Sequence, residues 1–214
     1  MMEQGLPRQQ GLYSPQFEHD ACGIGMLANI KGVRSHAVLQ DALEALNHLS
    51  HRGGTGAEPD TGDGAGILTQ LPDAFFRKVC PLEGMVLPAP GAYGVGMLFL
   101  ATDDTRRAGI EREFEIIVAD SGLTFLGWRT VPVNPSTLGK TALSCMPVIR
   151  QAFIQKSADI TDDMAFERKL YLIRKTAERR FRYAPEALPV DFYAAILSCR
   201  TIVYKGMLQA RQVS

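Results

Sequence analysis

A cysteine stands near the start of the chain, between a short polar leader and an apolar run. The residues Asp20, Ala21 and Cys22 lead directly into the sequence GIGMLANI. We predict a buried strand over residues 23–31, so that the thiol lies at the first residue of a core strand. If the leader is cut before Cys22, its freed α-amine, with a pKa of about 7.7–8.0, can act as the base for its own thiol. An N-terminal threonine nucleophile works by the same logic. The alternative is a structural cysteine, because free cysteines are among the most buried residues.

Two glycine-containing motifs follow, HRGG at residues 51–54 and TGDGAG at residues 61–66. An arginine that ends a helix beside a glycine turn can orient a carboxylate or brace the strand of a nucleophile. The structural alternative for Arg52 is a cation at a helix C-terminus, stabilised by the helix dipole. The second motif is not a dinucleotide loop, because Ile67 stands where G-x-G-x-x-G requires glycine. We interpret it as a turn that lets the backbone pass close to Cys22.

Several segments in a fixed order resemble one known family. Residues 11–68 contain GLYSPQFEHDACGIG, then HRGGTGAE, then TGDGAGIL. This trio resembles the amino-terminal glutaminase domain of the glutamate synthase large subunit. LGKTALSCMPVIRQAFI at 138–154 and SCRTIVYKGM at 198–207 are also similar to glutamate synthase segments. The resemblance implies a class II glutamine amidotransferase of the N-terminal nucleophile hydrolases.

The resemblance also implies roles for individual residues. Removal of a propeptide, residues 1–21, exposes Cys22 as the catalytic nucleophile of a domain that spans residues 22–214. The substrate is L-glutamine, and the ammonia released from it serves glutamate synthesis in a synthase domain. Arg52 and Gly53 are expected to form the active-site wall, and Asp63 to shape the loop beside it.

Two blocks of the family pattern are not found among the 214 residues. One is R-(F/Y)-S-T, whose arginine binds the substrate carboxylate. The other is H-N-G, whose asparagine and glycine form the oxyanion hole. We therefore expect a partial domain that is inactive alone and needs a completing chain or synthase domain. The alternative is a truncated, non-catalytic fragment that binds or regulates a synthase partner.

The elements that must position these residues follow from the pattern of apolar residues. Ser35 is the predicted N-cap of a helix that ends at Gly53 and Gly54. Strands are predicted at 66–71, 93–101, 124–133, 146–155 and 191–204, the last broken near Ser198, and further helices at 73–79, 104–121 and 162–182. Grouped strands with helices outside them indicate an α+β fold. The resemblance sharpens this to the four-layer αββα sandwich of the N-terminal nucleophile hydrolases, incomplete at the carboxyl end.

Composition excludes several other classes of function. The formal net charge is zero, with 23 basic and 23 acidic residues, so no nucleic-acid partner is expected. The four cysteines form no CxxC pair and no zinc pattern, so we expect no metal. The resemblance implies that a flavin and an iron–sulfur cluster belong to the synthase domain, none of which can be placed on this chain, so we expect no cofactor here. No apolar stretch reaches the roughly 18 residues of a membrane span, and the leader lacks a signal-peptide core. We predict a cytoplasmic protein in a reducing compartment.

Overall fold

The computed structural model describes residues 9, 11, 23–56, 58–183 and 191–213. Its largest unit is a four-stranded antiparallel sheet with the strand order β3-β4-β2-β5. The strands are β2 (Tyr93–Leu100), β3 (Thr124–Thr130), β4 (Val148–Gln155) and β5 (Phe192–Ser198). β2 is buried along nearly all its length, as expected of a central strand that is covered on both faces.

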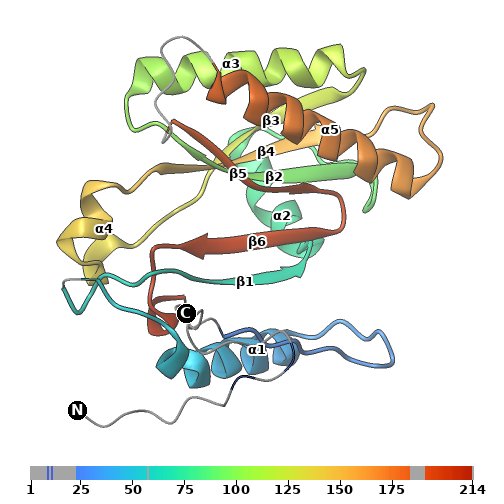
Figure 1. Cartoon of the computed structure of the whole chain (residues 1–214). Coiled ribbons are helices and arrows are strands. Elements are labelled where there is room, and N and C mark those ends of the chain that lie inside the picture. The colour runs from blue at the N-terminus through green and yellow to red at the C-terminus, as the bar shows by residue number, and fades with distance from the viewer. Residues whose placement is uncertain (1–8, 10, 12–22, 57, 184–190, 214) are drawn as a thin grey trace, which may run out of the picture.

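Two long helices cover one face of this sheet (Figure 1). They are α3 (Asp104–Asp120) and α5 (Asp163–Arg182), and the side chains of Asp103 and Asp162 cap their N-termini. Their apolar faces form a core with the sheet. Its buried members include Leu98, Phe114, Val118, Ile154, Phe166, Leu170 and Ile173.

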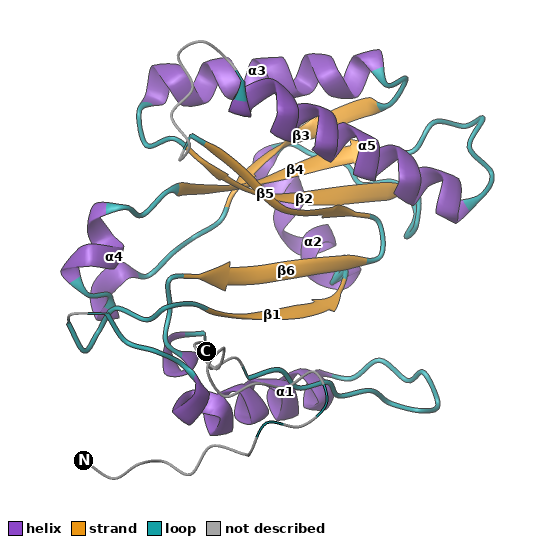
Figure 2. Ribbon diagram, viewed as in Figure 1, coloured by secondary structure: helices purple, strands orange, loops and turns teal. Residues whose placement is uncertain are grey.

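A second core lies on the opposite face of the sheet. Here the antiparallel pair β1 (Ala65–Gln70) and β6 (Thr201–Gly206) packs with α2 (Asp73–Val79) and the 3-10 turn η3 (Cys80–Glu83). Buried side chains of this core include Phe76, Tyr93, Val95, Met97, Phe153 and Ile202. Figure 2 shows β1 and β6 as a layer separate from the larger sheet.

The helix α1 (His36–His48) lies beyond β1 and β6, and η2 (Leu49–Arg52) follows it (Figure 1). The Ser35 hydroxyl accepts a hydrogen bond from the backbone N–H of Val38, which confirms the predicted N-cap. Three short helical turns, η4 (Pro135–Thr137), α4 (Lys140–Ser144) and η5 (Ala210–Gln212), complete the described elements. The layers therefore run helix, sheet, sheet, helix, which agrees with the predicted α+β class.

The predicted strands beyond residue 65 and the later helices are confirmed, with bounds shifted by up to three residues. The first predicted helix is confirmed as α1, but it ends at His48, and η2 continues the chain to Arg52. The break near Ser198 is also confirmed, because it separates β5 from β6.

The predicted buried strand at 23–31 is wrong. Residues 23–31 carry no ladder, and Ile24, Met26 and Ile30 are 97%, 92% and 102% exposed. The hydrogen bonds described here are local, as from the N–H groups of Lys31 and Val33 to the Asn29 side chain. An apolar run forms a buried strand only where a neighbouring strand pairs with it and another layer of the fold covers it.

Candidate active site

The HRGG motif forms the turn at the end of the first helix. α1 ends at His48, and η2 continues the chain through Arg52 to its C-cap, Gly53. The Gly53 N–H donates to the carbonyl of Ser50 at 3.2 Å. Arg52 is exposed, and no hydrogen bond or ion pair of its guanidinium is found among the described residues. This cation is therefore available to a carboxylate from outside these residues.

Gly23 packs against this turn. A Cβ atom built on Gly23 would lie 3.1 Å from Cβ of Arg52 and 3.3 Å from Cβ of Leu49. The residue that precedes Gly23 is the predicted nucleophile, Cys22, which lies outside the described residues. The immediate sequence neighbour of Cys22 is thus in contact with the predicted active-site wall.

Asp63 lies against the same turn from the other side. Its backbone N–H donates to the Gly54 carbonyl at 3.2 Å. A Cβ atom on Gly54 would approach Oδ2 of Asp63 to 2.8 Å, and one on Gly53 would lie 3.9 Å from Oδ1. Asp63 therefore lies beside Gly53 and Gly54, in the turn that follows Arg52. Its carboxylate occupies space that a side chain at Gly54 would need, while the distance to Gly53 is an ordinary contact.

A groove of about 1910 Å³ opens beside these residues. Residues 23–29, one face of α1 and the strands β1 and β6 line it, and Asp63 contributes a carboxylate at its edge. Most of the lining is apolar. Of the three predicted site residues, Asp63 lines the groove, whereas Arg52 and Gly53 do not.

The glycines of the TGDGAG motif allow the backbone to approach a second segment of the chain closely. A Cβ atom on Gly66 would approach the Tyr204 carbonyl oxygen and Cβ of Lys205 to 2.5 Å. On Gly62, a Cβ atom would be 2.5 Å from the carbonyl carbon of Leu208. The contacts described here are with β6 and the turn that follows it. These glycines allow close approach of two backbones, while the predicted approach to Cys22 involves a residue outside the described part of the chain.

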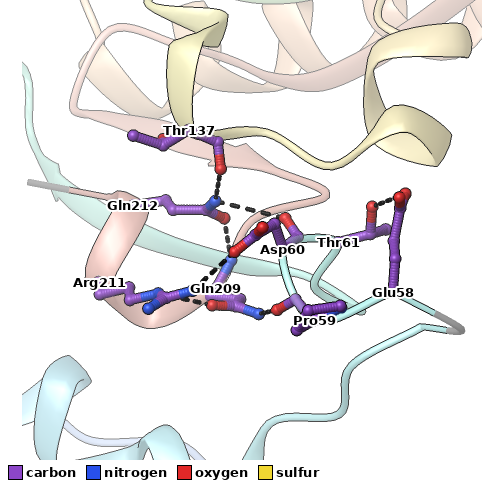
Figure 3. Close-up of polar contacts among 8 residues, drawn as sticks. All are labelled: Glu58, Pro59, Asp60, Thr61, Thr137, Gln209, Arg211 and Gln212. Atoms are coloured by element: carbon purple, nitrogen blue, oxygen red, sulfur yellow. Dashed lines mark hydrogen bonds and ion pairs between the residues drawn. The ribbon is translucent and has the colours of Figure 1, made fainter.

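Polar residues that the motifs did not identify hold the tip of the loop that joins Gly53 to Asp63 (Figure 3). Glu58 Oε1 accepts hydrogen bonds from the Thr61 hydroxyl at 2.6 Å and from the Thr141 backbone N–H at 2.5 Å. These bonds, led by that of Thr61, lower the pKa of Glu58 to about 2. Thr141 is 83 positions away in the sequence, so no local pattern could have indicated this contact.

The described cysteines differ in their exposure. Cys80 and Cys199 are buried, and burial raises the pKa of each thiol to about 11. Cys145 is exposed. In the described part of the chain, no group of three or more histidine, cysteine or acidic side chains is placed to hold a metal ion. None of the described helices is long and apolar enough to span a membrane.

Comparison with known proteins places this arrangement in a family. A family model described as glutamine amidotransferases class-II matches residues 22–214. The glutamate synthase [NADPH] large chain of Bacillus subtilis is 50% identical over 97% of this chain. Ferredoxin-dependent glutamate synthase 1 of Arabidopsis thaliana is 44% identical over 95%, and glutamate synthase [NADH] of Saccharomyces cerevisiae is 36% identical over 97%. The chain spans only 13%, 12% and 10% of these three relatives. It belongs to the class II glutamine amidotransferases, and within them it is similar to the glutaminase domain of glutamate synthase.

Proposed function

We propose that this chain carries the glutamine-hydrolysing site of a glutamate synthase, with Cys22 as its nucleophile. The observation that carries the proposal is the contact between Gly23 and the turn at Arg52. Asp63 packs on Gly53 and Gly54 of that same turn. Residues from three separate motifs meet there, next to a groove. The family match begins at Cys22, which supports a mature domain of 22–214 after loss of residues 1–21.

In the proposed reaction, the α-amine of Cys22 accepts the thiol proton through a water molecule, and the sulfur attacks the side-chain amide carbon of glutamine. The tetrahedral intermediate collapses as its C–N bond breaks, and the nitrogen takes the proton from the α-ammonium of Cys22 and leaves as ammonia. Water then cleaves the remaining glutamyl thioester to glutamate and the free thiol. Arg52 and Gly53 form the wall beside the nucleophile, and Asp63 holds the loop. Ammonia passes to a synthase domain, whose sequence lies outside these 214 residues.

The order of layers supports a finer assignment of the fold. Helices α3 and α5, the large sheet, the β1 and β6 pair, and α1 follow one another as in an αββα sandwich (Figure 1). We infer that the chain forms part of an N-terminal nucleophile hydrolase fold. In that fold the β1 and β6 pair takes up further strands from the rest of the domain.

The experiment compares Cys22→Ser with Cys80→Ala in the complete glutamate synthase polypeptide. Ammonia release from glutamine is expected to be lost in Cys22→Ser and kept in Cys80→Ala, whose thiol is buried in the second core and does not line the groove. Intact mass should show Cys22 as the first residue of the active protein. Full activity in Cys22→Ser, or an intact leader on active protein, would contradict the proposed mechanism. An inactive parent enzyme would favour the non-catalytic alternative.

A further inference from the structure

The loop over residues 53–63, named the site loop below, contains few features that would order it alone. Four of its residues are glycine, at positions 53, 54, 56 and 62, and glycine loses the most conformational freedom when it is ordered. Its base is closed by the Asp63 to Gly54 hydrogen bond and by a bridge between Thr55 and Gly62. Within the loop the Gly56 N–H also donates to the Thr61 carbonyl at 2.9 Å, and the Thr61 N–H donates to the Glu58 carbonyl at 3.4 Å. The tip residues Glu58, Pro59 and Asp60 are in addition held by contacts with other segments.

α4 holds one side of the tip. Glu58 Oε1 accepts from the Thr61 hydroxyl inside the loop and from the Thr141 backbone N–H in α4. Beside this contact, the Gly139 N–H donates to the Asp60 carbonyl at 3.1 Å. A Cβ atom on Gly139 would lie 2.8 Å from Glu58 Oε1 and closer still to the Thr61 hydroxyl. α4 and the site loop are therefore in direct contact, with no room for an added carbon.

The turn η5 holds the other side of the tip (Figure 3). The Gln209 side-chain amide donates to the carbonyl of Pro59, and Arg211 forms an ion pair with Asp60 at 3.1 Å. The Gln212 amide donates both to the Asp60 carbonyl, at 3.4 Å, and to the carbonyl of Thr137. Asp60 and Arg211 are exposed, where ion pairs contribute little, while Gln209 and Gln212 are half-buried, as Glu58 is. Glu58 differs from them because it receives two hydrogen bonds on one oxygen.

We propose that Glu58 is a positioning residue for glutamine hydrolysis, because it fastens the tip of the site loop to α4 and so holds Asp63 at the groove and against the turn of Arg52 and Gly53. The inference rests on the proposed function of the site. Glu58 itself does not touch the substrate. When Glu58 is removed, the loop keeps its base but gains freedom at the tip, and small displacements of substrate-binding groups lower the rate strongly.

The geometry provides a matched pair of variants. Both donors bond to Oε1, so Glu58→Gln keeps an acceptor at that place, whereas Glu58→Ala removes it. Thr61→Val tests the same contact from the donor side with little change of volume. Glu83→Ala is the control, since Glu83 is an exposed carboxylate of η3, outside the site loop.

The complete glutamate synthase polypeptide is assayed for ammonia release, with glutamine varied. For Glu58→Ala we expect kcat/KM to fall by about ten- to a hundredfold, mostly through KM, while Glu58→Gln and Glu83→Ala stay near the parent. Thr61→Val should lie between them. A glutamine-like diazoketone should label Cys22 more slowly in Glu58→Ala, whereas a small alkylating reagent should label it at the parental rate. A structural defect alone would slow both reagents or lower the Tm.

Amide hydrogen exchange across residues 53–63 gives a readout that does not depend on activity. Exchange should increase in Glu58→Ala and stay low in Glu58→Gln. Unchanged KM and exchange in Glu58→Ala, or equal impairment in Glu58→Gln, would overturn the inference. If Glu58→Ala fails to fold, the Thr61→Val variant takes its place. A KM of Thr61→Val equal to that of the parent would then overturn the inference. An inactive parent enzyme would instead contradict the proposed function, and the exchange data would still decide whether Glu58 holds the loop.

Discussion

At the scale of single residues, reactivity of the thiols follows from their surroundings. The thiolate is the nucleophilic form of cysteine, and burial disfavours it. Burial is the largest cause of the raised pKa of Cys80, and for Cys199 the nearby Glu167 and Asp163 add to it. Cys145 is exposed.

We therefore expect iodoacetamide at neutral pH to modify Cys145 and to spare Cys80 and Cys199 in the folded protein. A glutamine-like diazoketone should modify Cys22 alone in active enzyme, because it requires a glutamine site. Peptide mass spectrometry measures both patterns, and the denatured protein serves as the control in which all four thiols react. Equal diazoketone labelling of Cys22 and Cys145 would mean that Cys22 is an ordinary thiol.

The depressed pKa of Glu58 predicts a pH dependence of stability. The pKa is about 2 in the folded protein against an ordinary 4.5, because the Thr61 and Thr141 hydrogen bonds favour the ionised form. The stabilisation is therefore present above pH 4.5 and is lost as the pH falls towards 2. The neighbouring charges, Asp60 and Arg211, form their own exposed ion pair.

The measurement is the denaturant midpoint of the parent and of Glu58→Gln across this range. The parent should be the more stable above pH 4.5, and the difference should shrink towards zero near pH 2. The amide keeps the hydrogen-bond acceptor but has no proton to gain, which makes it the matched comparison. A difference that stays constant with pH would contradict the hydrogen-bonded carboxylate.

Sequence motifs indicated the local part of the proposed site and missed the part formed by distant segments. Arg52, Gly53 and Asp63 belong to short motifs, and Asp63 packs on the turn that contains the other two. Glu58 was missed because its partner Thr141 lies on a separate turn, and a side chain in a loop carries no periodic pattern. The position of Cys22 relative to Arg52 is still a prediction, supported by the contact of Gly23.

At the scale of elements, the β1 and β6 pair depends on a glycine. β1 and β6 are antiparallel, and Ala65 at the start of β1 pairs with Gly206 at the end of β6. In this register Gly66 lies opposite Lys205. A Cβ atom on Gly66 would be 2.5 Å from the Tyr204 carbonyl oxygen, which is backbone and cannot turn away. One of the two strands must shift if a side chain is added here.

We expect Gly66→Ala to destabilise the protein by about 1–3 kcal/mol, as overpacking does. Gly109→Ala is the control, because Gly109 lies in α3 with no atom within 4 Å of its added Cβ. That helical substitution should stabilise the protein by about 0.5–1 kcal/mol. Thermal unfolding measures both effects, and a Gly66→Ala protein as stable as the parent would show that β6 moves without cost.

Strands that have neighbouring strands in the structure were predicted correctly. The predicted strand at residues 23–31, which has no such neighbour among the described strands, was not. β2 has a strand on each side and helices over one face, so its apolar run predicted a strand correctly. Residues 23–31 show a similar apolar pattern, but no described strand pairs with them. A sequence pattern indicates which residues are apolar enough to be buried. Whether another strand or helix covers them depends on the rest of the molecule.

At the scale of the whole molecule, an apolar face next to the proposed site is open. Leu68 on β1 is 61% exposed, and Ile24 and Met26 are 97% and 92% exposed along the same groove. β6 pairs only with β1 among the described strands, so its other edge is free. Contiguous exposed apolar surface of this kind is typical of an interface. Relatives of which this chain spans 10–13% have ample sequence to cover it.

We therefore predict that the 214-residue chain releases little ammonia from glutamine by itself. It contains the proposed nucleophile Cys22, but neither R-(F/Y)-S-T nor H-N-G, the blocks to which the family resemblance assigns binding of the carboxylate and of the developing oxyanion. Loss of one oxyanion donor typically costs on the order of a hundred- to a thousandfold in rate.

Ammonia release is measured for this chain, for the chain with the following family segment added in trans, and for the complete polypeptide. Activity should rise in that order. Hydrogen exchange over residues 23–31 and β6 should fall in the same order, because we expect the added strands both to cover the groove and to complete the site. The control is the segment added to Cys22→Ser, which should gain protection without gaining turnover. Equal turnover by the 214-residue chain alone would show that its own residues already supply the oxyanion hole, and the proposed division of the site between two sequence regions would then be wrong.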